Sequence, residues 1–563
     1  MATAGTAARG THTVTNQAEP LEGYNVFEAD RPLVDAVQRE GAAWATARIA
    51  AVGELAGRAD TIRLGFEANE NPPRLRTHDQ HGRRIDEVEF HPAWHELLGL
   101  GVRHGLHALP WRERQSGAHV ARAAMFISLA QAEAGIGCPL SMTYSVVPAL
   151  RAQPELAAEW EERFLSYDYD ASVLPATEKA GALAGMAMTE KQGGSDVRAN
   201  TTFARPIGGG GPGGEDEITG HKWFCSAPMC DAFLVLAQAE GGLSCFLLPR
   251  WKPDGERNGF HLQRLKDKLG NRSNASSEVE FESAWARLVG EEGRGVPTII
   301  EMVSHTRLDC VLGSTAGMRA GVAAAINHAT QRTAFGSALV DQPLMRNVLG
   351  DLAVESEAAT VSAMWLARQF DQSVDTGSDP AAGRADDEAP LQRLATPILK
   401  YWTCKRAPAH AVESLECLGG NGYVEESGMP RLFRESPLQS IWEGSGNVQA
   451  LDGLRAMASS PAAVEALFAE LRSAEGAERR LDDFVDSLER DLSEPDELEA
   501  RARRIAESMA LALQGSLLVR FGDQAAADAF CASRLDGDWG EAFGTLPAGT
   551  DFKRIIARHS PVS

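Results

Sequence analysis

Residues 188–196 read Met-Thr-Glu-Lys-Gln-Gly-Gly-Ser-Asp, and this stretch lies where the hydrophobic pattern of the chain changes. Before it, from Arg31 to about Leu183, apolar residues recur at three- and four-residue spacing, which is typical of helices. After it come short segments rich in β-branched and aromatic residues, which indicate strands. The glycines allow close approach of a flat or phosphorylated ligand, and the hydroxyls can donate to its oxygens. On spacing alone, an N-capped turn explains the stretch equally well.

Short strands are predicted for the region that follows. Five segments have the required composition: Thr201–Arg205, Glu217–Lys222, Ala232–Ala237, Ser244–Leu248 and Ser277–Phe281. Together they predict a β-domain of about a hundred residues. The glycine-rich segment Gly208–Gly214 lacks the Lys-Ser/Thr ending of a phosphate-binding loop and lies between two of these strands. We therefore expect a flexible hairpin tip there.

Helical spacing resumes at Val296 and continues to Ala456. It is broken once, by Asp371–Pro390, whose Asp, Gly, Ser and Pro content is typical of a solvated loop. The order of elements predicts an α+β fold, mainly α, in four parts. These are an N-terminal arm and helical domain (residues 1–184), a central antiparallel β-domain (185–290), a four-helix bundle (295–456) and an extra C-terminal helical region (461–563).

Composition restricts where the protein works and what it binds. No apolar stretch approaches the roughly 18 residues of a membrane span, and residues 1–17 lack the apolar core of a secretory signal, so we expect a cytoplasmic protein. The eight cysteines form no Cys-x-x-Cys pair, which predicts reduced, buried thiols and no metal site. The formal net charge of −23 repels nucleic acid unless cations gather on one face.

Two further segments combine groups that suit a ring and a phosphate. Arg332-x-x-Phe335-Gly336 precedes Gln342; an arginine can bind a pyrophosphate through two hydrogen bonds, and a phenylalanine can stack on a ring. Leu418–Tyr423 contains three glycines in four positions, which suits a turn close to phosphates. Each pattern is weak by itself.

Two other segments have a plain structural interpretation. Residues 219–226, Thr-Gly-His-Lys-Trp-Phe-Cys-Ser, alternate like a strand and end in an aromatic pair, as a core strand with a buried tryptophan would. Residues 441–447, Ile-Trp-Glu-Gly-Ser-Gly-Asn, place Glu443 at a loop-to-helix junction, where the helix dipole favours an acid.

Taken together, and in this order over roughly Arg31–Arg455, the five segments resemble the acyl-CoA dehydrogenase family. That family carries a Thr-Glu-x-x-x-Gly-Ser-Asp segment, a Gly-x-Lys-x-aromatic-Ile-Ser/Thr strand and an aromatic-Glu-Gly-Thr/Ser segment. The resemblance implies a homo-oligomer, as a tetramer, with FAD between the β-domain and the bundle and shared across subunits. The residues that it assigns to the cofactor are Met188, Thr189, Gly194, Ser195, Phe224, Cys225, Ser226, Arg332, Phe335, Gln342, Leu418, Gly419, Gly420, Ile441, Trp442, Gly444, Ser445 and Asn447.

The resemblance also assigns the chemistry. It implies that Glu443 is the catalytic base, which removes the α-proton of an acyl-CoA thioester while hydride leaves the β-carbon for the flavin. Isovaleryl-CoA-type members instead place their base on a helix, just before an arginine. Here that position is Thr306, before Arg307, which is no carboxylate. The chain departs from the family at Glu416, where a glutamine is usual, and at Cys225, where an apolar residue is usual.

A narrower resemblance is to the adaptive alkylation-response branch of this family. It rests on residues 71–73, 90–95, 188–197 and 265–276 and on the additional C-terminal region. Proteins of that branch bind double-stranded DNA, so the resemblance implies DNA binding through the C-terminal region. Here, however, residues 461–563 hold 12 Lys/Arg and 20 Asp/Glu, a net charge of 12 − 20 = −8. Two alternatives therefore stay open: a metabolic short- or branched-chain acyl-CoA dehydrogenase without DNA binding, and a non-enzymatic protein that keeps FAD as a structural cofactor.

Overall fold

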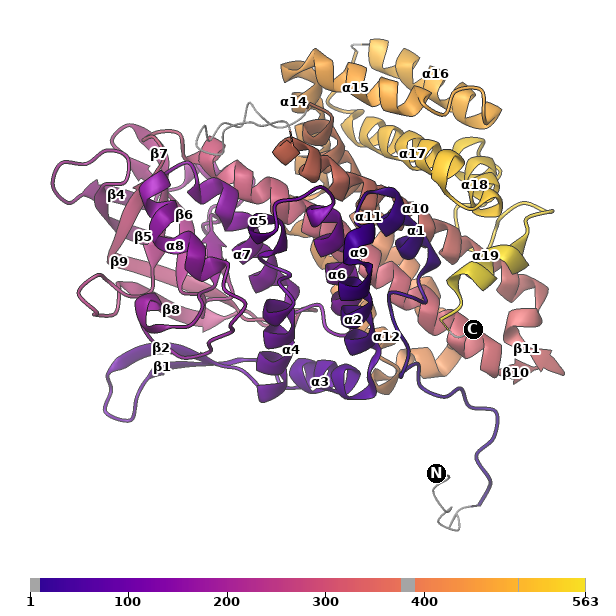
Figure 1. Ribbon diagram of the computed structural model, residues 1–563, viewed down its shortest axis with the longest axis horizontal. Coiled ribbons are helices and arrows are strands. Elements are labelled where there is room, and N and C mark those ends of the chain that lie inside the picture. The colour runs from indigo at the N-terminus through magenta and orange to yellow at the C-terminus, as the bar shows by residue number, and fades with distance from the viewer. Residues whose placement is uncertain (1–10, 376–389, 495, 562–563) are drawn as a thin grey trace.

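The computed structural model describes residues 11–375, 390–494 and 496–561, and Figure 1 shows their arrangement. The β-domain lies at one end of the molecule, long helices cross the middle, and the C-terminal helices lie against these at the other end. Among the described helices, none combines the length and the apolar character needed to cross a membrane.

The N-terminal region is mainly helical, as predicted. Its helices are α1 (Arg31–Arg39), α2 (Thr46–Gly57), α3 (Ala59–Glu70), α4 (Pro92–Arg103), α5 (Leu109–Arg112), α6 (Ala118–Ala130), α7 (Gly137–Leu150) and α8 (Pro154–Phe164). Nearly every residue of α6 and α7 is buried, so these two helices form the centre of this region. A hairpin of β1 (Arg74–His78) and β2 (Arg84–Glu89) interrupts the helices. The sequence prediction missed it because its strands are rich in charged residues and have almost no buried face.

The β-domain has seven strands: β3 (Ala184–Ala187), β4 (Phe203–Pro206), β5 (Glu215–Ser226), β6 (Ala232–Ala239), β7 (Gly242–Pro249), β8 (Phe260–Leu265) and β9 (Ser276–Val289). They pair in the order β3-β6-β4-β5-β9-β7, and an additional β6–β7 pairing closes the sheet on itself. Most pairs are antiparallel, as expected, but β3 and β4 run parallel to β6. The prediction lacked β3 and β8, and it placed the Gly208–Gly214 tip correctly between β4 and β5.

The helical bundle is formed by α9 (Gly295–Gln331), α10 (Pro343–Asp375) and α11 (Pro390–Glu416), followed by α12 (Met429–Glu435), α13 (Leu438–Ile441) and α14 (Gly446–Ser459). The expectation of a single break at Asp371–Pro390 is wrong. A short hairpin, β10 (Thr333–Ala334) with β11 (Ser337–Ala338), separates α9 from α10, and irregular chain follows α11. Helix α10 also continues to Asp375, and the remainder of the expected loop, 376–389, lies outside the described residues.

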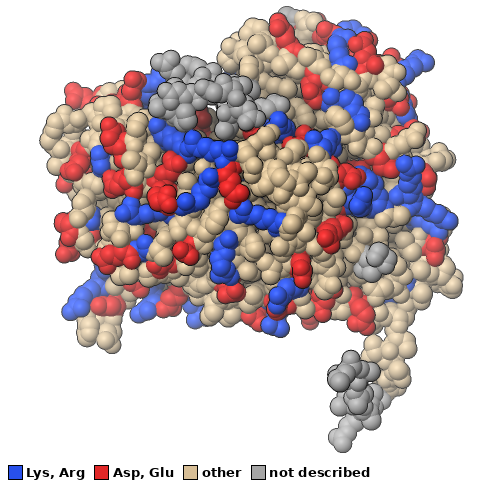
Figure 2. Space-filling view, in the orientation of Figure 1, with Lys and Arg blue, Asp and Glu red and all other residues tan. Residues whose placement is uncertain are grey.

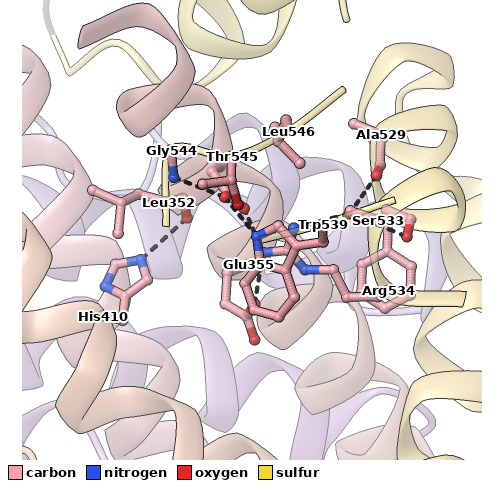
Figure 3. A network of polar contacts seen from close by, with 12 residues as sticks. Leu352, Glu355, His410, Ala529, Ser533, Arg534, Trp539, Gly544, Thr545 and Leu546 are labelled. Atoms are coloured by element: carbon pink, nitrogen blue, oxygen red, sulfur yellow. Dashed lines mark hydrogen bonds and ion pairs between the residues drawn. The ribbon is translucent and has the colours of Figure 1, made fainter. Parts of the chain in front are cut away.

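The C-terminal region adds α15 (Pro461–Arg472), α16 (Arg479–Ser493), α17 (Ala502–Phe521), α18 (Gln524–Phe530), a π-helical turn (Cys531–Leu535) and α19 (Phe552–His559). Figure 3 shows how it is fastened to the bundle by a buried polar network. The Arg534 guanidinium lies 3.0 Å from Glu355 of α10 and also pairs with Asp351. The Trp539 indole donates to Asp351 as well, at 3.1 Å. Because these charges are buried and mutually paired, the region is an integral part of the fold.

Candidate active site

A buried ion pair joins the 188–196 segment to β5. The Glu190 carboxylate and the Lys222 ammonium lie 2.9 Å apart, and neither side chain is exposed. The backbone amide of Trp223 donates to the carbonyl of Thr189 at 2.8 Å. Burial opposes the charge of Glu190, but the hydrogen bond from Thr201 and the charge of Lys222 prevail and lower its pKa to about 2. The pair was not predicted, although a lysine inside a strand pattern was a signal for it, and it fixes Thr189 beside the end of β5.

The end of β5 presents an aromatic ring and hydroxyl groups at the surface. Phe224 is 49% exposed, Ser195 is exposed, and Thr189 and Ser226 are half-buried. A Cβ atom on Gly194 would lie only 2.5 Å from the Thr189 hydroxyl, so any larger residue there would displace the Thr189 side chain. An accessible ring beside hydroxyl donors is suited to a flat ligand with polar edges.

The side chains of Cys225 and Met188 are largely inaccessible from this surface. The Cys225 thiol is fully buried, and burial raises its pKa to about 12. All eight cysteines are buried and unpaired, as predicted. Met188 is half-buried against the core, and its carbonyl accepts a hydrogen bond from Asn200. A ligand at the end of β5 would therefore meet the backbone of Cys225 and not its sulfur.

Glu443 lies in a turn just before α14 whose backbone is strained. The φ angles are +58° at Glu443 and +106° at Gly444, and a non-glycine residue seldom adopts the former. The carbonyl of Glu443 accepts hydrogen bonds from Arg307 Nε at 3.2 Å and from Gln449 Nε2 at 2.9 Å. The ammonium of Lys400 donates to the carbonyl of Gly444. These three donors hold the turn in place.

The Glu443 side chain itself is buried. Its Oε2 atom has no hydrogen-bond donor among the described residues, and the Thr306 hydroxyl lies beside the carboxyl group. Burial raises the pKa of Glu443 to about 7, although Thr306, Arg307 and Lys400 act to lower it. A carboxyl group with such a pKa can take up a proton at physiological pH.

A small cavity of about 60 Å³ lies between the end of β5 and this turn. Its walls include Ser226 of β5, Cys138 of α7 and Trp442. Trp442, the residue before Glu443, lines this cavity, and the Cys138 thiol of its wall interacts electrostatically with the Glu443 carboxyl. The other predicted residues surround the turn: Ile441, Ser445 and Asn447 are exposed, and Trp442 and Gly444 are half-buried. The structure thus brings three of the five predicted segments together.

The other two segments lie at the far end of α9. Thr306 and Gln331 are 331 − 306 = 25 residues apart on this helix, or about 38 Å at 1.5 Å per residue. Arg332 follows the helix, and Leu418 lines the same cavity as His328. One chain therefore does not bring Arg332 and Leu418 to the site beside Glu443.

The β10–β11 hairpin holds Phe335 away from the protein. Phe335 and Gly336 have φ angles of +52° and +86°, as in a two-residue type I′ turn, and the Phe335 ring is 100% exposed. The Gln342 amide braces the hairpin through the Ser337 hydroxyl at 2.6 Å. Arg332 donates to the carbonyl of Asn16 in the N-terminal arm.

The glycine turn after α11 is open. Gly419 and Gly420 are exposed, and a Cβ atom at either would meet no other atom within 4 Å. Gly419 has a φ of +60°, so a glycine suits this turn. Glu416, in the last turn of α11, is exposed and faces solvent.

Models of three protein families match consecutive parts of the chain. The adaptive response protein AidB N-terminal domain matches residues 16–171, the acyl-CoA dehydrogenase middle domain matches 185–284, and the acyl-CoA dehydrogenase C-terminal domain matches 293–458. The chain is also 45% identical, over 528 residues, to the putative acyl-CoA dehydrogenase AidB of Escherichia coli K12. That match covers 93% of this chain and 95% of the relative.

Solved structures share the fold. The structure of Caenorhabditis elegans ACDH-11 in complex with C11-CoA has a TM-score of 0.82 and 26% identity, over 94% of this chain and 93% of that one. An acyl-CoA dehydrogenase from Bacillus anthracis complexed with FAD has a TM-score of 0.64 and 18% identity, over 83% and 85% of the two chains.

Proposed function

The chain belongs to the acyl-CoA dehydrogenase family, with an AidB-type N-terminal domain, and on this basis we propose that it binds FAD and oxidises the α,β-bond of an acyl-CoA thioester. The observation that carries the proposal is the buried Glu443 carboxyl, whose Oε2 has no donor among the described residues and whose neighbour in the chain, Trp442, lines the small cavity. A thioester whose α-carbon entered that cavity would present the carboxylate with a proton to remove.

The residues at the end of β5 fit the flavin part of FAD. The exposed Phe224 ring offers a stacking surface, and the Thr189 and Ser226 hydroxyls can donate to a ring edge. Ser195, beyond the two glycines, is placed to donate to a phosphate oxygen. When bound, FAD would accept the β-hydrogen of the thioester as a hydride.

Protein groups would supply the proton transfer. Glu443 takes the α-proton on its carboxylate, and its backbone amide would donate to the thioester oxygen and stabilise the developing enolate. Arg307 and Lys400 fix the carbonyls of this turn and so orient the amide. Thr306, the position of the base in isovaleryl-type members, lies beside the Glu443 carboxyl. The two positions at which family members carry the base, Glu443 and Thr306, thus lie side by side here, and Glu443 is the one that has a carboxyl group.

Flavin bleaching tests this proposal. Purified protein with bound FAD is mixed without oxygen with a panel of acyl-CoA thioesters, and flavin absorbance is followed. We expect bleaching with at least one thioester. If no thioester bleaches the flavin, the protein is not a dehydrogenase and FAD is a structural cofactor.

We further propose a homotetramer in which each FAD contacts two subunits. Three observations support it: Arg332 follows the end of α9, about 38 Å along this helix from Thr306 beside Glu443; the Phe335 ring is fully exposed; and Tyr423 in the glycine turn is 82% exposed. Exposed aromatic side chains of this kind are typical of contact surfaces. The adenine half of the cofactor would lie against these residues of a neighbouring subunit.

A second activity, association with duplex DNA in an alkylation response, would rest on few side chains. Seven arginines of the C-terminal region pair with carboxylates: Arg472, Arg479, Arg480, Arg520, Arg534, Arg554 and Arg558. Arg501 donates to backbone carbonyls. Arg503 and Arg504, near the start of α17, are exposed neighbours. Arg503 Nε donates to the Tyr401 hydroxyl at 3.2 Å, and the charges of both arginines favour a phosphate contact. Figure 2 shows acidic and basic side chains interspersed over the visible face, so we infer weak, salt-sensitive binding.

A further inference from the structure

A second and much larger cavity, of about 630 Å³, lies along one face of α9. Between residues 313 and 324, the residues of α9 that line it are small: Gly313, Ser314, Ala316, Gly317, Ala320 and Ala324. Asn327 and His328 line its far end, together with Leu418. Leu432 of α12 lines the opposite side, and residues 18–22 of the N-terminal arm also border the cavity. Gly313 and Ala324 are 324 − 313 = 11 residues apart, so this wall is about 17 Å long. We call this cavity the α9 channel.

The α9 channel meets the small cavity beside Glu443. Both are lined by Ala130, Ala134, Gly313 and Gln439. Three of these residues have little or no side chain, so Gln439 is the group that fills the junction. The small cavity alone, at about 60 Å³, is only a few times the roughly 10–15 Å³ that a single water molecule requires on the same measure. It has room for a short acyl group, whereas the α9 channel falls within the roughly 300–1,000 Å³ of ligand sites.

Gln439 is poorly held at this junction. Its side chain packs where Gly313 has no Cβ atom, since a Cβ there would lie 2.7 Å from Gln439 Nε2. Its Oε1 atom is buried and has no hydrogen-bond donor among the described residues. A buried amide oxygen without a hydrogen-bond partner is unfavourable. Moving the Gln439 side chain would break no hydrogen bond to this oxygen.

We propose that Gln439 is a movable partition and that the α9 channel takes the distal carbons of a long, straight acyl chain. The inference rests on the proposed function, because it assumes a thioester beside Glu443. With Gln439 in place, short acyl groups occupy the small cavity. A longer chain displaces the Gln439 side chain and extends past Gly317 and Ala320. At roughly 1.3 Å per carbon of an extended chain, the wall of small residues accommodates about a dozen carbons.

The first experiment measures binding in the absence of turnover. Glu443→Gln protein with FAD bound is titrated calorimetrically with saturated acyl-CoA thioesters of 4 to 16 carbons. We expect affinity to rise about two- to fourfold per added carbon as each methylene is buried, and to continue rising beyond eight carbons. An affinity that levels off at six carbons or fewer would overturn the proposal.

Substitutions then place the chain in the channel. Gly317→Phe projects a ring into it and should reduce the affinity for the 14-carbon thioester to that of a short one, with the 4-carbon affinity unchanged. Gly317→Ala is the matched control, because a Cβ there meets only Leu432, at an ordinary 3.6 Å. Gln439→Ala, which removes the partition, should raise the 14-carbon affinity severalfold. If Gly317→Phe does not fold, Ala320→Leu provides the same block further along.

The outcomes separate this inference from the proposed function. Wild-type bleaching together with chain-length-independent binding would overturn the α9 channel and leave the dehydrogenase standing. Chain-length-dependent binding without any bleaching would support the channel as an acyl-binding site and overturn the dehydrogenase. Gly317→Phe protein that binds all thioesters as the wild type does would place the acyl chain elsewhere.

Discussion

Arg307 hydrogen bonds to the backbone of Glu443, because its Nε lies 3.2 Å from the Glu443 carbonyl while its terminal nitrogen pairs with Asp452 at 2.6 Å. The arginine thus fixes the turn, and its charge is balanced by Asp452. The Glu443 carboxyl is left buried with one oxygen lacking a donor among the described residues. The same arrangement positions an acid and keeps its pKa high, which is what a general base at neutral pH requires.

Replacing Glu443 by Gln should abolish proton removal while keeping the shape of the site. We expect FAD content and melting temperature near those of the wild type, with acyl-CoA-dependent flavin reduction slowed by about 10²-fold or more. Glu435→Gln is a matched control, since Glu435 is half-buried and its carboxylate accepts hydrogen bonds from Asn271. Rapid-mixing absorbance measurements decide the matter, and an undiminished rate in Glu443→Gln would mean that another group is the base.

The rate of flavin reduction should depend on pH through Glu443. Its pKa lies near 7, raised from 4.5 by burial, and only the deprotonated carboxylate can accept the α-proton. The rate should therefore rise with pH, reach half its maximum near pH 7 and level off above about pH 8. Below pH 6 it should fall about tenfold per unit, as for a single ionisation. The residual rate of Glu443→Gln is the control, and a flat wild-type profile between pH 5.5 and 8.5 would contradict the assignment.

The β-domain shows what the sequence could predict. Strands β5, β6, β7 and β9 alternate or are continuously apolar, and their approximate positions were predicted from that pattern. β1 and β2 were missed because charged residues dominate them, and β3 because it has only four residues, all buried and none β-branched or aromatic. Local patterns identify an element only where one of its faces is markedly apolar.

The candidate site shows a similar limit. Motif residues named the loops that carry Thr189, Ser226 and Glu443. In the structure Ser226 and Trp442 line one cavity, and Thr189 is hydrogen bonded to Trp223 of the same strand as Ser226. The partners in contacts between distant segments were not predicted, such as Glu190 for Lys222 or Arg307 for the Glu443 carbonyl. They depend on chain segments that meet only after folding, and sequence spacing does not encode that meeting.

Removal of the Phe335 ring should weaken the shared cofactor site. Phe335→Ala should not change the stability of the hairpin, because the ring is fully exposed within one chain. We expect an unchanged fold by circular dichroism, but faster loss of FAD on dilution and a shift from tetramer towards smaller species. Phe521→Ala is the control, as Phe521 is an exposed ring of the C-terminal region, 42% accessible. Sedimentation with flavin detection gives both quantities, and equal FAD retention in the two variants would remove Phe335 from the site.

Breaking the buried network of Figure 3 should loosen the C-terminal region. Arg534→Ala leaves Asp351 and Glu355 buried with fewer partners, which costs about 3–5 kcal/mol for a buried ion pair. Arg479→Ala is the control, because its pair with Asp483 is exposed and its loss should change stability by less than about 0.5 kcal/mol. Urea denaturation and limited proteolysis measure the effect. Equal stability of the two variants would show that the network does not fasten the region.

Binding to duplex DNA, if the protein has it, should depend on Arg503 and Arg504. Arg501 is unsuitable for a test, because it donates to the backbone carbonyls of Asp491 and Asp496 and its loss would disturb the chain there. The hydrogen bond of Arg503 is to a side chain, the Tyr401 hydroxyl, so its loss leaves the backbone in place. We expect Arg503→Ala with Arg504→Ala to weaken binding equally for all sequences, since phosphate contacts carry no base information. The slope of log K against log salt should become shallower by about 1–2, because each phosphate contact contributes about 0.9.

The control for this test is a second pair of exposed arginines at the other end of the molecule. Arg74→Ala with Arg76→Ala removes the same charge from β1, far from α17 in Figure 1. If overall charge alone governs binding, both double variants will shift the salt series by the same amount. If the α17 pair contacts phosphate, only its loss will reduce the slope. If the wild-type protein binds no duplex even at low salt, the alternative function is favoured, a metabolic dehydrogenase without DNA binding. Most other arginines of the C-terminal region are already paired with carboxylates or carbonyls.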